Sequence, residues 1–142
     1  MTHQPHTRKA PPGMRLPVPR HVVLASLLMG VGTLTLGIGY ATVAVYRRPD
    51  VEARSVVAAI EHPLGWCMAV IGAWVLLAVI TGHTRASAHV VAAVAHGVYL
   101  AAVLITIVLT YPLTPPQLGA LALFGLIAHG GAALDYWKRG YR

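Results

Sequence analysis

Charged residues are scarce in this chain of 142 residues, and acidic residues are the scarcest. Asp, Glu, Lys and Arg together make up 11% of the sequence, against roughly a quarter in an ordinary soluble domain, so a water-facing surface could not be built. The four acidic residues lie at the edges of the apolar runs, and no H-E-x-x-H spacing occurs. The single cysteine, Cys67, excludes an internal disulfide and has no base near it in sequence. We therefore expect a protein that is not an enzyme and holds no metal.

Long apolar runs fill most of the sequence instead, since 56% of the residues are hydrophobic. A helix that crosses a hydrocarbon core of about 30 Å needs about 20 residues. Four runs meet this length, and the only carboxylate in them, Asp135, lies close to an end; they are residues 21–46, 64–82, 88–111 and 118–137. The sequence predicts an all-α integral membrane protein with an up-down bundle of four transmembrane helices.

The basic residues indicate an orientation. Eight of the eleven Lys and Arg flank one side of the predicted spans, within residues 1–20, at Arg85 and within residues 138–142. By the positive-inside rule, both termini are expected in the cytoplasm and the protein in the cell membrane. Residues 1–20 carry five prolines and no periodicity, so they are predicted to be a disordered tail. A cleaved signal peptide ending near residues 42–44 is the alternative, but the first run is much longer than a signal core.

The connections differ in length. Residues 47–63 form the longest, and they are predicted to hold a short amphipathic helix on the outer surface that ends or kinks at Pro63. A continuous extension of the helix at 64–82 is the alternative. Residues 82–87 and 112–117 are short connections, which predicts antiparallel neighbours.

Small residues indicate where the helices approach one another. In lipid, helix association depends on close backbone contact, which glycine permits. Gly30 and Gly37 share one face of the first helix, and Gly32 and Gly39 lie nearly opposite. A close neighbour is therefore expected on each face, and a second copy of the chain could supply one of them. Gly65 and Gly72 continue the pattern in the second helix.

Polar residues gather on one face of the third predicted helix. They span an arc of about 80° at 3.6 residues per turn, and they are His89, His96, Tyr99, Thr106 and Thr110. On the fourth helix, His129 lies among small residues. His96 and His129 both lie about 13 Å from the same membrane surface. A threonine hydroxyl can bond to its own helix, but we expect that these imidazoles cannot and need partners on other helices.

Three interpretations of the histidines remain open. They could form structural hydrogen bonds between helices, line a path for protons or ions, or bind a b-type haem through His96 and His129. His129-Gly130-Gly131 with Asp135-Tyr136 resembles, over eight residues, part of the haem-bearing membrane anchor of succinate dehydrogenases. That resemblance implies haem ligation, with the nearby glycines leaving room for the porphyrin.

The net charge of +7 does not indicate nucleic-acid binding, because the basic residues are scattered at helix ends without a basic stripe. We expect anionic lipid headgroups as their partners. The leading functional prediction is an oligomeric ion-conducting or membrane-permeabilising protein, in the size class of phage holins and superinfection-exclusion channels. The alternatives are a haem-binding anchor of an electron-transfer complex and an accessory subunit with a membrane-protein partner.

Overall fold

Four helices make up most of the part of the chain that the computed structural model describes. That part comprises residues 15–42, 56–110 and 117–141, without the side chains of 56–61, 110, 117 and 118. The helices are α1 (Arg20–Thr42), α3 (Val56–Thr81), α4 (Arg85–Thr110) and α5 (Gln117–Lys138). Each is long and apolar enough to cross a membrane, and the described residues form no strand. The prediction of four apolar helices of membrane-spanning length is confirmed.

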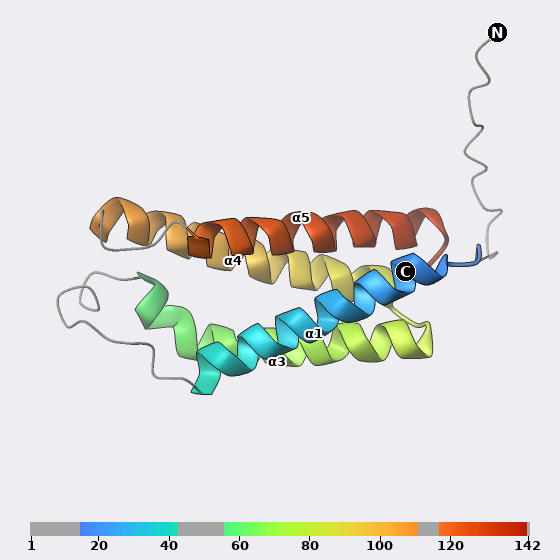
Figure 1. Cartoon of the computed structure of the whole chain (residues 1–142), viewed down its shortest axis with the longest axis horizontal. Coiled ribbons are helices and arrows are strands. Elements are labelled where there is room, and N and C mark those ends of the chain that lie inside the picture. Colours follow the sequence, from blue (N-terminus) through green and yellow to red (C-terminus); the bar gives the residue numbers. More distant parts are fainter. Residues whose placement is uncertain (1–14, 43–55, 111–116, 142) are drawn as a thin grey trace, which may run out of the picture.

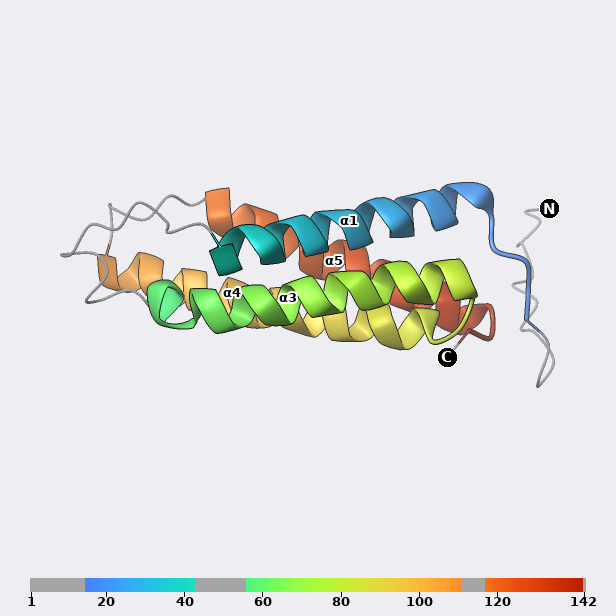
Figure 2. The ribbon, with the colours of Figure 1, turned by 90° about the horizontal axis from the view of Figure 1, so that it is seen from below.

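The bundle is built from consecutive neighbours. α1 packs along α3, α3 along α4 and α4 along α5, whereas α1 and α5 are also neighbours but touch much less (Figures 1 and 2). α1 begins and α5 ends at the same end of the bundle (Figure 1). The Leu16 N–H donates a hydrogen bond of 3.0 Å to the Arg139 carbonyl there, so the two described ends of the chain are tied together.

Within the described residues, the prediction that a separate helix ends at Pro63 is wrong. α3 already begins at Val56 and continues through Pro63 as one helix, as the alternative held. A proline within a helix removes one backbone hydrogen bond, and here only two turns precede it, so little of the helix depends on that bond. Residues 47–55, the rest of the predicted connection, lie outside the described residues, as do residues 1–14.

The turn between α3 and α4 is shorter than predicted. Only Gly82, His83 and Thr84 separate the two helices, and Gly82 has φ 77°, which glycine adopts without a steric penalty. Its N–H donates to the Ala78 carbonyl at 3.0 Å, which ends α3 with a left-handed cap. The Arg85 side chain donates from Nη2 to the Val79 carbonyl at 2.7 Å, so a cation sits at the negative end of the helix dipole.

Glycine contacts hold α1 against α3. A Cβ atom at Gly37 would meet the backbone of Gly65 and Ala69, and one at Gly72 would meet the backbone of Leu34. Gly30 lies under Leu76, whose Cδ2 would be 2.9 Å from an added Cβ. The Gly30–Gly37 face therefore packs on α3 within the chain.

On the opposite face of α1, the described residues do not supply the close neighbour that was expected. An added Cβ at Gly32 or Gly39 would meet nothing within 4 Å among the described residues. Among the described residues, only one of the two small-residue faces packs closely on another helix, because α1 contacts α3 far more than α5.

The distribution of polarity is the reverse of that in a soluble bundle. Large apolar side chains point outward on every helix, and Val108, Ile80 and Phe124 are 81%, 73% and 71% exposed. The polar residues Ser26 and His89 are 0% exposed. Lipid-facing apolar surface with polar groups inside is the arrangement that a bilayer favours.

Candidate functional site

The candidate site is a column of polar side chains in the interior of the bundle, at three levels of α1. Ser26, Thr33 and Tyr40 follow one another at seven-residue intervals on α1, so they lie on one face about 10 Å apart. Each of them bonds to a polar side chain of α4 or α5.

The middle level joins three helices through a hydrogen-bonded chain. Nδ1 of His89 on α4 lies 2.8 Å from Nδ1 of His129 on α5, and Nε2 of His129 lies 3.0 Å from Oγ1 of Thr33 on α1. All three side chains are at most 2% exposed. His129 thus uses both ring nitrogens, one toward each neighbouring helix.

Only two hydrogen arrangements satisfy this chain when both rings are neutral, because each ring carries one N–H. Either His89 Nδ1–H donates to His129, whose Nε2–H donates to Thr33, or Thr33 donates to His129, whose Nδ1–H donates to His89. His89 Nε2 is buried without a partner among the described residues. This nitrogen is therefore the last atom of the hydrogen-bonded chain. It carries a free lone pair in the first arrangement and an N–H without an acceptor in the second.

His96 takes a different role from the one expected. Its Nδ1–H donates to the carbonyl of Ala92 at 2.9 Å, one turn earlier on α4. The expectation that these imidazoles cannot bond to their own helix is wrong for this residue, because the ring folds back along α4 within reach of a carbonyl four residues away. The His96 and His129 rings do lie side by side, with centroids 5.2 Å apart, as their matched depth predicts.

Gly125 makes room for the His96 ring. A Cβ atom at Gly125 would collide with Cδ2 of His96 and lie 2.7 Å from Cγ. α5 can therefore carry only a glycine here while the ring keeps its position.

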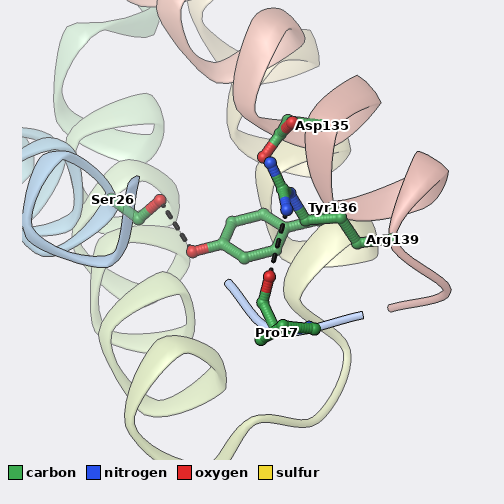
Figure 3. A network of polar contacts seen from close by, with 5 residues as sticks. All are labelled: Pro17, Ser26, Asp135, Tyr136 and Arg139. Atoms are coloured by element: carbon green, nitrogen blue, oxygen red, sulfur yellow. Dashed lines mark hydrogen bonds and ion pairs between the residues drawn. The ribbon is translucent and has the colours of Figure 1, made fainter. Parts of the chain in front are cut away.

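The first level lies at the end of the bundle where the chain ends meet. The Tyr136 hydroxyl donates to Oγ of Ser26 at 3.0 Å, which links α5 to α1 (Figure 3). The Tyr136 ring stacks on His89 with centroids 5.5 Å apart, and the Arg85 guanidinium lies 5.6 Å from its centre. Tyr136 thus separates the histidine chain from the charged end.

A small charged cluster covers this level. Arg139 Nε donates to Asp135 at 2.8 Å, and Arg139 Nη1 donates to the Pro17 carbonyl at 3.0 Å (Figure 3). The one carboxylate of the predicted membrane runs is therefore paired with an arginine one turn away.

The third level pairs two tyrosines. The Tyr99 hydroxyl of α4 donates to the Tyr40 hydroxyl of α1 at 2.8 Å. Thr106 is buried further along α4. Thr110 is the last residue of α4, and its side chain lies outside the described part.

A porphyrin does not fit between His96 and His129. Iron would need one ring nitrogen from each residue and a flat macrocycle between them. The two rings instead lie against each other, and both nitrogens of His129 already bond to Thr33 and His89. In the described parts of the chain, no group of three or more His, Cys, Asp or Glu is arranged to hold a metal ion.

A groove of about 730 Å³ opens between α1 and α5 beside this column. Its walls include Leu28, Met29, Phe124 and Ile127. Thr33, His96 and His129 also line it, and because they are at most 3% exposed they lie at its bottom.

The sequence predicts the histidines and Tyr99 as candidate residues, but it did not reveal their partners on α1. Ser26 and Thr33 are buried on the same helix as Gly30 and Gly37, whose face was predicted only to approach a neighbouring helix. Their seven-residue spacing with Tyr40 was the available signal, since residues seven apart share a helix face. Comparison with protein-family models, with characterised proteins and with solved structures finds no match for this chain.

Proposed function

We propose that the protein conducts protons across a membrane along the polar column of its bundle. The observation that carries this proposal is the buried chain from His89 through His129 to Thr33, with hydrogen bonds of 2.8 and 3.0 Å. Imidazole is the side chain that exchanges protons near neutral pH, and ionisable residues inside a membrane mark proton relays.

One relay step follows from the two hydrogen arrangements. A proton binds the lone pair of His89 Nε2, and the Nδ1–H proton of His89 passes to His129 Nδ1. The Nε2–H proton of His129 passes to Thr33, whose own hydroxyl proton leaves to a water molecule. One proton enters and one leaves, and the chain changes from the first arrangement to the second. Reorientation of the rings and the hydroxyl restores the starting state.

Water molecules complete the path in this proposal. Thr33 is about 10 Å along α1 from Ser26 and from Tyr40, which is too far for a direct hydrogen bond. Bridging waters between polar groups are nearly as favourable as direct bonds. The tyrosine levels at Tyr136 and Tyr99 would then pass protons between such waters.

Protons are the only ions that we propose to be conducted, and we do not propose a wide, holin-like hole in the membrane. A wide aqueous hole needs a polar face toward its lumen, whereas the outward side chains of the four helices are largely apolar. A hydrogen-bonded column transmits protons and excludes hydrated metal cations.

Replacing Thr33 with valine tests the relay with almost no change of shape. We expect proton flux into liposomes, driven by a potassium diffusion potential and read with a trapped pH dye, to fall several-fold. Thr35→Val is the matched control, because Thr35 is exposed on the same helix. Equal flux in the two variants, or parental flux no greater than in protein-free liposomes, would contradict the proposal and favour an accessory subunit.

We infer that the end of the bundle with the described chain ends faces the cytoplasm. All Lys and Arg of the described residues lie at this end, at Arg15, Arg20, Arg85, Lys138 and Arg139. The positive-inside rule assigns such an end to the cytoplasmic side of the cell membrane, where anionic headgroups favour it.

Thiol labelling tests this orientation. In a Cys67→Ser background, single cysteines at Ser55 and Thr114 are expected to react with an impermeant maleimide added to intact cells. A cysteine at Thr84, in the turn between α3 and α4, is expected to react only after lysis. Labelling of Thr84→Cys in intact cells would reverse the orientation.

A further inference from the structure

At the bottom of the groove between α1 and α5 lies a hydrogen-bond acceptor that the polar column does not use. His96 is 3% exposed, and its Nδ1–H donates to the Ala92 carbonyl. Because a neutral imidazole has only one N–H, its Nε2 carries a lone pair that can accept a hydrogen bond. Nε2 has no hydrogen-bond partner among the described residues, and the Cδ2–Nε2 edge lies over Gly125, which lines the groove. A ligand in the groove would therefore have to donate a hydrogen bond.

The depth of this acceptor restricts the chemistry of the donor. The groove extends along α5 from Asp135 to Leu121, about 21 Å, and Gly125 lies about 15 Å from its charged end. That position is within the hydrocarbon region of a membrane, where a charged headgroup is expensive to bury. A phospholipid headgroup is thereby disfavoured, and a small neutral donor such as a hydroxyl is favoured.

The size and lining of the groove restrict the rest of the ligand. A volume of about 730 Å³ lies in the range that encloses drug-sized molecules. The walls are apolar except at Thr33 and the histidines at the bottom and at His21, Ser26 and Asp135 toward the charged end. Gly32 on α1 and Gly131 on α5 line the groove with open space around them, which widens its mouth.

We propose that this groove binds a neutral, membrane-soluble alcohol or phenol with a long apolar body, whose hydroxyl donates to His96 Nε2. The ligand enters from the lipid between α1 and α5, the two neighbouring helices with the least contact between them. This binding does not rest on proton conduction, because it uses His96 rather than the His89–His129–Thr33 chain.

The test compares 4-octylphenol with octylbenzene, which has the same apolar body without the hydroxyl. The full chain, with ¹⁵N-labelled histidines, is titrated in phosphatidylcholine nanodiscs at matched probe concentrations in the membrane. We expect a saturable shift of His96 Nε2 with 4-octylphenol and binding of octylbenzene about tenfold weaker, as expected for one buried hydrogen bond.

Two adjacent glycines provide matched variants. Neither Gly130 nor Gly131 has an atom within 4 Å of an added Cβ, but only Gly131 lines the groove. Gly131→Leu is expected to weaken binding of 4-octylphenol at least about tenfold through steric exclusion, and Gly130→Leu to leave it unchanged.

Three results would overturn the proposal. Equal affinities of the two probes would mean that the groove accepts any apolar chain, such as a lipid acyl chain. Equal effects of the two leucine variants would place the binding elsewhere. Disulfides between copies that carry cysteine at Leu28 or Phe124, undiminished by 4-octylphenol, would assign the groove to a second copy of the chain.

Discussion

Gly37→Leu is expected to disrupt the packing of α1 on α3 and to destabilise the bundle strongly. The first side-chain atom at this position would already collide with the backbone of Ala69 and lie 2.7 Å from the Gly65 carbonyl oxygen. Backbone atoms cannot move aside as a flexible side chain can, so the helices must separate. We expect a loss of about 3 kcal/mol or more in the free energy of unfolding, the range of severe core overpacking.

Gly39→Leu is the matched control two residues away. No described residue lies within 4 Å of a Cβ added there, so the unfolding transition in mixed detergent micelles, followed by circular dichroism, should match that of the parent. Equal destabilisation by the two variants would contradict the α1–α3 packing.

The same pair of variants distinguishes packing within the chain from the homo-oligomer that the sequence predicts. Gly39 lies on the face of α1 that no described residue covers closely, so Gly39→Leu is expected to reduce cross-linked dimers without altering unfolding. Dimers that persist in Gly39→Leu would remove this face of α1 from the oligomer interface.

His129→Phe is expected to reduce proton flux in liposomes at least about tenfold, a larger effect than that of Thr33→Val. Of the residues that the structure describes, His129 alone bonds to both His89 and Thr33, and phenylalanine keeps a ring of similar shape without a nitrogen. The substitution also leaves His89 Nδ1 buried without a partner, so some loss of stability should accompany the loss of flux.

His83→Phe provides the control, because His83 is exposed in the turn between α3 and α4. Its flux should equal that of the parent. Parental flux in His129→Phe, with the folded fraction verified by circular dichroism, would exclude the histidine chain as the proton path.

The depth of the histidines could be predicted from the sequence, but their partners could not. Counting residues from the charged ends placed His96 and His129 at one level, and their rings lie 5.2 Å apart. The direct bond of His129 goes to His89 instead, because a ring reaches along its helix toward the preceding turn and the tilt of α4 against α5 decides which neighbour it meets. His96 folds onto Ala92 in the same structure, a choice of rotamer that no spacing reveals.

The sequence by itself determined that the chain forms four apolar helices long enough to cross a membrane. Runs of about 20 apolar residues with few charges are stable in a bilayer as helices, because a helix satisfies its backbone hydrogen bonds internally. The sequence also determined which faces could come close, since small residues, above all glycine, allow close approach of two backbones. The tertiary structure alone decided that α3 occupies the Gly37 face of α1 and that no described residue lies close to Gly39. It also decided that Thr33 meets His129 and that a groove opens above His96, because these depend on the rotation and separation of whole helices, to which local sequence is insensitive.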